Sequence, residues 1–103
     1  MKQKNHKTLI ALVGGLFLFT TGNSLATDYR PAMLANPCAG CHGPDGASPG
    51  PIPPLKGLPG SYIISAMQAF KTDQRQGTVM NRIAKGYTDE EIKLMAGYFE
   101  AGR

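Results

Sequence analysis

Residues 38–42 read Cys-Ala-Gly-Cys-His, two cysteines three positions apart with a histidine directly after the second. This spacing is the attachment pattern of a c-type haem. Positions i and i+3 of one helical turn share a face, so both sulfur atoms can reach the two vinyl groups along one porphyrin edge. The next residue then brings its imidazole to the iron as an axial ligand. The pattern predicts one covalently bound haem c, with Cys38 and Cys41 forming the thioethers and His42 binding the iron.

Three other interpretations of the paired cysteines are weaker. A thioredoxin-type redox pair belongs to a βαβ context, and the sequence shows no strand-like alternation. A structural zinc ion takes four ligands, whereas the chain adds only His6 to the three residues of the motif. A plain disulfide would leave His42 without a role, although the two thiols can form one transiently before haem is attached.

Residues 1–26 have the pattern of a secretory signal peptide. Three lysines precede an apolar run over residues 9–21, and small residues occupy the two cleavage-determining positions before Thr27. We therefore expect cleavage there, which leaves residues 27–103 as one domain. The alternative is a retained membrane anchor, but the run is shorter than the roughly 20 residues that span a bilayer. Export predicts a periplasmic location, where haem c is attached, and no membrane span after processing.

The charge pattern argues against a nucleic-acid partner. The chain has 11 Lys and Arg against seven Asp and Glu. Three of the lysines lie in residues 1–26, so residues 27–103 carry eight basic and seven acidic side chains. No basic stripe is interleaved with aromatic residues, as nucleic-acid binding would require. A domain of 77 residues has a thin core and usually needs a staple, which a covalently bound haem would supply.

Helical patterns dominate the domain. Three stretches have helical periodicity or helix signals: residues 28–36, 61–70 and 89–101. Pro37 should stop the first helix at the preceding residue, and a capping box formed by Thr88 and Glu91 should begin the last one. Residues 43–60 contain 11 Gly or Pro and predict an irregular loop that wraps the flat ring. The sequence thus predicts an all-α fold, with three to four short helices around one haem.

An electron-transfer haem usually has a second strong axial ligand, and a methionine thioether opposite histidine raises the reduction potential. Met33 is too close to Cys38 along the chain to cross the ring easily, and Met67 and Met95 lie on apolar helix faces. Met80 lies in a polar segment well beyond the haem motif, so the chain can return there on the opposite side of the ring. We expect Met80 to be the ligand, with Met67 as the alternative.

The second ring nitrogen of the histidine should donate a hydrogen bond to a backbone carbonyl, which fixes the tautomer and the orientation of the ring. The proline-rich residues 51–55 are the natural source of that carbonyl, because proline holds the backbone rigid. Simple stiffening of the loop is the alternative role of these prolines.

These patterns together resemble a class I cytochrome c over the whole of residues 27–103. The likeness rests on four parts of the sequence: residues 38–43, 53–58, 80 and 94–99. The resemblance implies thioethers at Cys38 and Cys41 and iron ligands at His42 and Met80. It also implies that Pro53 supplies the carbonyl to His42.

Within that class, residues 35–38, 62–75 and 83–92 are most similar to the cytochrome subunit of flavocytochrome c sulfide dehydrogenases. Some members have two haem domains, whereas the single haem motif here corresponds to a single-haem form. The resemblance implies a carrier that takes single electrons from a flavoprotein sulfide dehydrogenase subunit. It would pass them to other c-type cytochromes or a terminal oxidase. The alternative is a free c4- or c5-like shuttle of a respiratory or photosynthetic chain.

If both axial positions of the iron are filled, no open site is left for a substrate. We therefore expect an electron carrier and not an enzyme. The competing class is an enzyme or gas sensor whose sixth position is open or labile.

Overall fold

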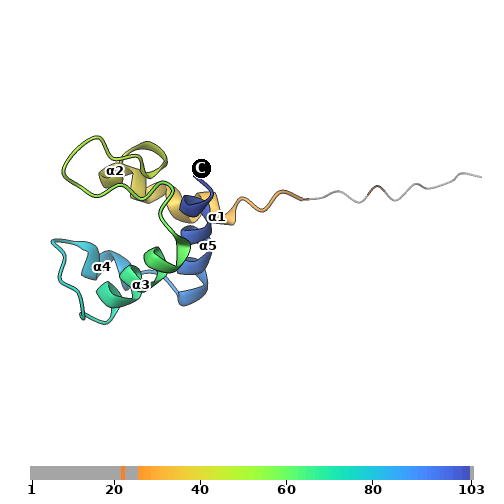
Figure 1. The fold of residues 1–103 in the computed structure, drawn as a ribbon. Helices are drawn as coiled ribbons and strands as arrows, with labels where there is room; N and C mark the ends of the chain where they lie inside the picture. The colour runs from red at the N-terminus through yellow and green to blue at the C-terminus, as the bar shows by residue number, and fades with distance from the viewer. Residues whose placement is uncertain (1–21, 23–25, 103) are drawn as a thin grey trace, which may run out of the picture.

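The computed structural model describes residues 22 and 26–102, and this part of the chain is helical without strands (Figure 1). Its elements, in chain order, are α1 (Arg30–Ala35), η1 (Asn36–Cys38), α2 (Ala39–His42), η2 (Pro44–Gly46), α3 (Gly60–Lys71), α4 (Met80–Ala84) and α5 (Asp89–Glu100). The predicted all-α fold is therefore confirmed. The predicted signal segment, residues 1–26, lies outside the described residues except for Gly22 and Ala26.

Helices α1 and α3 both pack against α5 (Figure 1). Its buried side chains recur at the spacing of one helical face: Ile92, Met95, Ala96 and Phe99. The other elements complete the core with Ala35, Ile63, Met67 and Ala84. None of the helices in the described part has the length and apolar character that crossing a bilayer requires.

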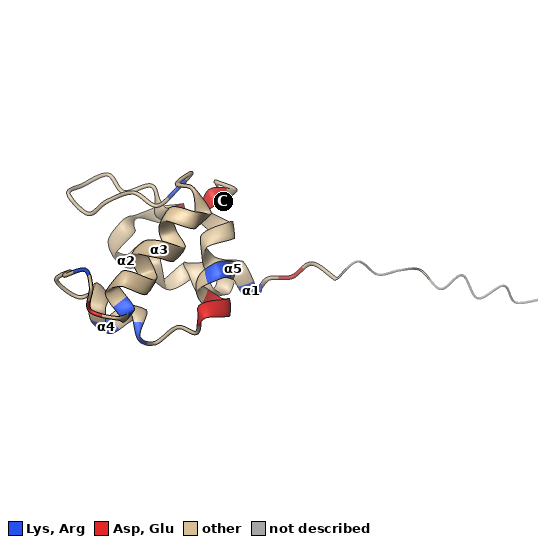
Figure 2. Cartoon of the chain, turned by 60° about the horizontal axis from the view of Figure 1, so that its bottom comes forward, with Lys and Arg blue, Asp and Glu red and all other residues tan. Residues whose placement is uncertain are grey.

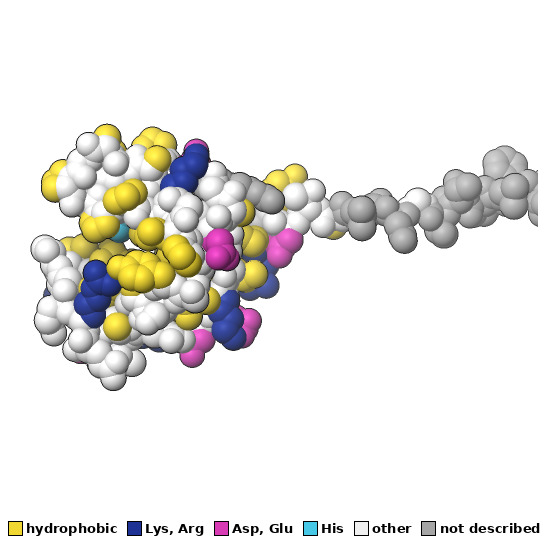
Figure 3. Space-filling view, viewed as in Figure 1, with side chains coloured by type: hydrophobic (Ala, Val, Ile, Leu, Met, Phe, Trp, Pro, Cys, Tyr) yellow, Lys and Arg dark blue, Asp and Glu magenta, His cyan; other side chains and the backbone are white. Residues whose placement is uncertain are grey.

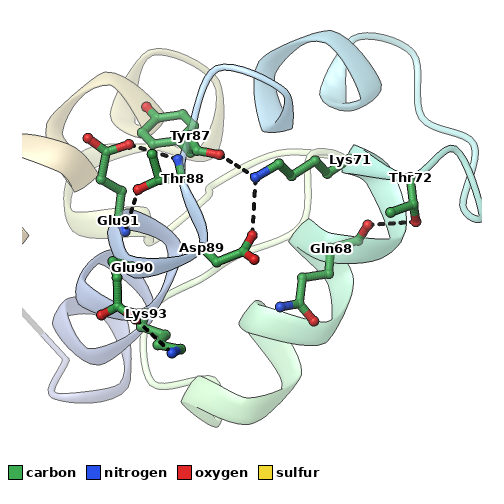
Figure 4. A network of polar contacts seen from close by, with 9 residues as sticks. All are labelled: Gln68, Lys71, Thr72, Tyr87, Thr88, Asp89, Glu90, Glu91 and Lys93. Carbon is green, nitrogen blue, oxygen red and sulfur yellow. Dashed lines mark hydrogen bonds and ion pairs between the residues drawn. The ribbon is translucent and has the colours of Figure 1, made fainter.

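The predicted capping box begins α5 as expected. The Oγ1 atom of Thr88 accepts from the backbone N–H of Glu91 at 3.2 Å, and Oε2 of Glu91 accepts from the N–H of Thr88 at 2.8 Å (Figure 4). Lys71, at the end of α3, donates to the carbonyl of Tyr87 at 2.7 Å and to the carboxylate of Asp89 at 3.1 Å. The start of α5 is thereby fastened to the end of α3.

The first helical region differs from the prediction at Pro37. Helix α1 ends at Ala35, but the chain continues in a helical conformation through η1 and into α2. Pro37 lies in the first turn of η1, where its missing N–H breaks no hydrogen bond and its fixed φ suits a helix. It therefore changes the type of helix and does not stop the helical path.

Helix α4 was not predicted. It has five residues and begins at Met80, after a loop that follows α3. Figure 1 shows α3 and α4 beside each other at one end of the molecule, while α2 and the Gly- and Pro-rich loop lie at the other end. We call these two ends lobes: one contains α2 with the haem motif, and the other contains α4 with Met80. Both lobes connect to the α5 core.

Candidate haem site

The haem motif lies on a helical turn that ends at a glycine. Cys38 and Ala39 both have helical φ and ψ values, and α2 then runs to His42. Gly43 ends the helix with φ +83°, and a Cβ there would meet the carbonyl oxygen of Ala47 at 2.8 Å. The positive φ and this close approach both require glycine. The two cysteines are thus three positions apart on one continuous helical turn.

The two cysteines differ in environment. Both carry free thiols, Cys38 half-buried and Cys41 exposed. The sulfur of Cys38 lies 3.7 Å from that of Met95, a buried residue of α5. Burial raises the pKa of the Cys38 thiol, and a backbone hydrogen bond opposes this shift. One cysteine of the motif therefore contacts the core, and the other faces solvent.

His42 is oriented by the Gly- and Pro-rich loop. Its Nδ1 atom lies 2.6 Å from the carbonyl oxygen of Pro53. Because a carbonyl only accepts, the hydrogen of the neutral ring is on Nδ1, which leaves the lone pair of Nε2 for a metal. No hydrogen-bond partner of Nε2 occurs among the described residues. The arrangement has the proton placement that an imidazole ligand of iron requires.

Backbone hydrogen bonds hold the loop in place. The carbonyl of Gly46 accepts from the N–H of Leu55 at 2.7 Å and from that of Lys56 at 3.2 Å. The N–H of Gly57 donates to the carbonyl of Phe99 in α5 at 2.8 Å. Gly46 itself is buried, and a Cβ there would lie 2.9 Å from the Phe99 ring. The loop is thus fastened to the core on both sides of the segment that contains Pro53.

The methionines fall into different environments. Met67 and Met95 are 7% and 1% exposed and belong to the core, whereas Met33 is 71% exposed on α1. Met80 is half-buried at the first residue of α4 and packs against the edge of the core. Met67 and Met95 therefore pack among core side chains, as their apolar helix faces predict. Met80 stays the predicted sixth ligand.

Asn81 is a residue that the sequence did not single out. Its side chain, directly after Met80, hydrogen bonds to the Phe70 carbonyl in the last turn of α3 and to three groups of the loop between α3 and α4. A lone asparagine in a polar segment carries no recognisable signal of this kind, because its partners, three backbone groups and the Asp73 carboxylate, are brought together only by the folded loop.

The surface near the histidine suits a flat apolar group. Figure 3 shows a histidine side chain (cyan) in the indentation between the two lobes, with hydrophobic side chains (yellow) on both sides. Several large apolar side chains of the two lobes also stay partly exposed, including Ile52, Val79 and Ile83. A haem tied to the motif would cover the hydrophobic side chains that Figure 3 shows on both sides of the histidine, so the donor set and its surroundings fit the group.

A CxxCH turn on an all-α core, with the histidine held by a proline carbonyl, defines the class I c-type cytochromes. The sequence pattern of the cytochrome c family matches residues 31–101, and the chain belongs to this family. Family membership implies a covalently bound haem c and a haem-based electron carrier.

Three curated relatives are similar to this chain. The cytochrome subunit of sulfide dehydrogenase from Chlorobaculum tepidum is 51% identical over 73 residues, which cover 71% of this chain and 66% of that protein. Cytochrome c-552 from Acidithiobacillus ferridurans is 41% identical over 62% of this chain and 28% of its own length. Cytochrome c-554(548) from Halomonas halodenitrificans is 37% identical over 62% of this chain and 82% of its own length. The chain thus spans less than two thirds of the first two relatives.

Proposed function

We propose that this chain is a periplasmic single-haem cytochrome that accepts electrons from the flavoprotein subunit of a sulfide dehydrogenase. The observation that supports the partner is the 51% identity to the Chlorobaculum sulfide dehydrogenase cytochrome subunit, over a segment that includes most of this chain. Haem bound to the chain would supply a one-electron Fe(II)/Fe(III) couple. The chain itself would be an electron carrier and not an enzyme.

Each site residue has a distinct part in this proposal. Cys38 and Cys41 would hold the haem as thioethers, and His42 would bind the iron through Nε2. The Pro53 carbonyl keeps the proton on Nδ1 and makes the imidazole a stronger donor to the metal. Met80 would bind the opposite face of the iron and raise its reduction potential.

The exposed part of the haem motif is the expected contact with partners. The resemblance to class I cytochromes implies that the thioether edge of the haem, beside Cys38 and Ala39, would lie at the surface. The basic and acidic side chains of residues 27–103 are nearly equal in number. Three of the lysines are paired with an acidic side chain: Lys71, Lys85 and Lys93. Figure 2 shows that the positions of the basic and acidic residues are spread over several parts of the ribbon. Such a surface favours a contact held by apolar packing over long-range electrostatic steering.

Purification of the native protein from the periplasmic fraction tests the partner. We expect it to co-elute with a flavoprotein, and sulfide to reduce the haem in that complex but not in the separated chain. A monomer without flavin, whose haem sulfide does not reduce even after the flavoprotein is added, would contradict the subunit assignment. That result would support the second candidate, a free c4- or c5-like shuttle, which the 82% coverage of the Halomonas cytochrome favours.

The export and the haem count have their own test. The intact mass of the periplasmic protein should equal residues 27–103 plus one haem, with Thr27 at the N-terminus. A mass that includes residues 1–26 would contradict the predicted cleavage, and the mass of a second haem would contradict the single-haem form.

A further inference from the structure

The side chain of Asn81 connects most of the loop between α3 and α4. Its Nδ2 atom lies 2.7 Å from the carbonyl oxygen of Arg75, 3.1 Å from that of Phe70 and 3.2 Å from Oδ1 of Asp73. Its Oδ1 atom accepts from the N–H of Gly77 at 2.9 Å. One amide thus connects the last turn of α3 to three residues of the loop.

Only a carboxamide satisfies these partners together. The two N–H bonds of Nδ2 are shared among three acceptors, while Oδ1 serves the one donor. A carboxylate could accept from Gly77 but could not donate to the two carbonyls, and it would face the carboxylate of Asp73. An alanine would leave all four groups without this partner.

The loop is closely packed around this contact. Asp73 has φ +58°, a conformation that non-glycine residues rarely adopt and that surrounding contacts must stabilise. Its second carboxylate oxygen is 2.8 Å from Nζ of Lys85. A Cβ on Gly77 would meet the Phe70 ring at 2.9 Å, and the Arg75 guanidinium lies 4.8 Å from the centre of the same ring. The loop therefore has a defined shape that depends on several joined contacts.

Met80 lies between the groups that Asn81 fixes. A Cβ added to Gly77 would lie only 3.2 Å from Cβ of Met80, so the backbone of Gly77 lies close to Met80 at the end of the loop. Asn81 follows Met80 directly in α4. Met80 thus lies between two residues that are joined by a hydrogen bond: Gly77, three positions before it, and Asn81, directly after it. This bond restricts the position of Met80 from both sides.

We propose that Asn81 is a positioning residue that holds the α3–α4 loop closed and so keeps the Met80 thioether on the haem iron. This inference rests on the proposed role of Met80 as the sixth ligand. If the loop is already ordered when the protein has folded, binding of the thioether to the iron requires no further loss of loop entropy. The thioether then competes better with an external ligand for the iron. Without the amide, the loop opens more readily and the external ligand gains.

Imidazole displacement from the oxidised holoprotein tests this role, with loss of the methionine-to-iron charge-transfer band as the signal. Asn81→Ala should lower the imidazole concentration at half displacement about tenfold, as expected for losing one or two net hydrogen bonds of the closed loop. Asn81→Asp, nearly identical in shape, should show a similar decrease, because it lacks the two donors. The control Gln76→Ala removes an exposed amide from the same loop and should stay within about twofold of the unchanged protein.

The outcomes separate the two levels of the proposal. If Met80→Ala keeps the band, the ligand assignment is wrong and the role of Asn81 falls with it. If Met80→Ala loses the band but either Asn81 variant has the imidazole midpoint of the unchanged protein, the ligand stands and the positioning role is wrong. Denaturant unfolding of the same samples completes the test. A lower unfolding midpoint with an unchanged imidazole midpoint would show that Asn81 serves global stability only. Asn81→Asp keeps the test available if Asn81→Ala does not fold.

Discussion

The Nδ1 atom of His42 and the carbonyl oxygen of Pro53 lie 2.6 Å apart, although the two residues are separated by 11 positions in the chain. The contact joins the end of α2 to the middle of the Gly- and Pro-rich loop. It fixes which ring nitrogen carries the proton, and it ties the electronic properties of the histidine to the shape of the loop. A change in the loop should therefore be detectable at the iron.

Replacing Pro53 with Gly should raise the reduction potential of the haem. A looser loop weakens the hydrogen bond from Nδ1, which makes the imidazole a poorer donor and stabilises Fe(III) less. Pro51→Gly is the matched control, since it adds similar backbone freedom at an exposed proline of the same loop. Spectroelectrochemical titration of both variants measures the effect. Equal potentials in the two variants would mean that the Pro53 carbonyl does not tune the histidine.

Replacing Met80 with Ala should abolish the methionine-to-iron charge-transfer band of the oxidised protein. Met67→Ala is the control, because Met67 is 7% exposed in the core and its loss should leave the band intact. That control should nevertheless lower the free energy of unfolding by about 2–5 kcal/mol through the cavity it creates. The reverse pattern, with the band lost only in Met67→Ala, would assign the ligand to Met67.

Replacing Gly43 with Ala should destabilise the holoprotein by about 1–3 kcal/mol. The residue has φ +83°, and the added Cβ would lie 2.8 Å from a backbone oxygen that cannot move without shifting the loop. Gly97→Ala is the comparison, since nothing lies within 4 Å of its Cβ position in α5. It should be neutral or stabilising by up to about 1 kcal/mol. Denaturant unfolding followed at the haem absorption distinguishes the two, and similar losses in both would refute the strain argument.

Tyr87 should make stability depend on pH in the alkaline range. Burial raises the pKa of its phenol, and the nearby carboxylate of Glu91 raises it further. Because the folded-state pKa is above that of the unfolded chain, the contribution to stability is complete below about pH 10 and is lost as pH rises through the folded pKa. The difference in unfolding free energy between the unchanged protein and Tyr87→Phe should therefore shrink as the pH is raised beyond that value. A constant difference across the range would show that Tyr87 ionises equally in both states.

The sequence predicted those parts of the fold that depend on local patterns. The capping box at Thr88 and Glu91 and the apolar face of α5 can be recognised within a few residues, and both are present. Helix α4 could not be recognised, because five residues are too few to show a helical period. The predicted end of the helical path at Pro37 was wrong, because a proline can either end one helix or lie in the first turn of the next. Only the surrounding packing selects between these two positions.

The candidate site divides in the same way. The haem motif is local, so spacing alone is enough to predict its residues. The contacts of Asn81 depend on backbone groups of the loop between α3 and α4, whose positions follow from the packing of Phe70 and Gly77. Long-range arrangements of this type leave no period or motif in the sequence.

The central claim is that this chain carries one electron on a haem whose two axial positions are both filled by its own side chains. The most direct test is the visible spectrum of the reduced holoprotein at neutral pH, before and after addition of carbon monoxide. We predict an unchanged six-coordinate low-spin spectrum, because His42 and Met80 as axial ligands would leave no free position on the iron. A rapid shift to a carbon monoxide-bound spectrum would contradict the account and would place the protein among enzymes or gas sensors with an open sixth position.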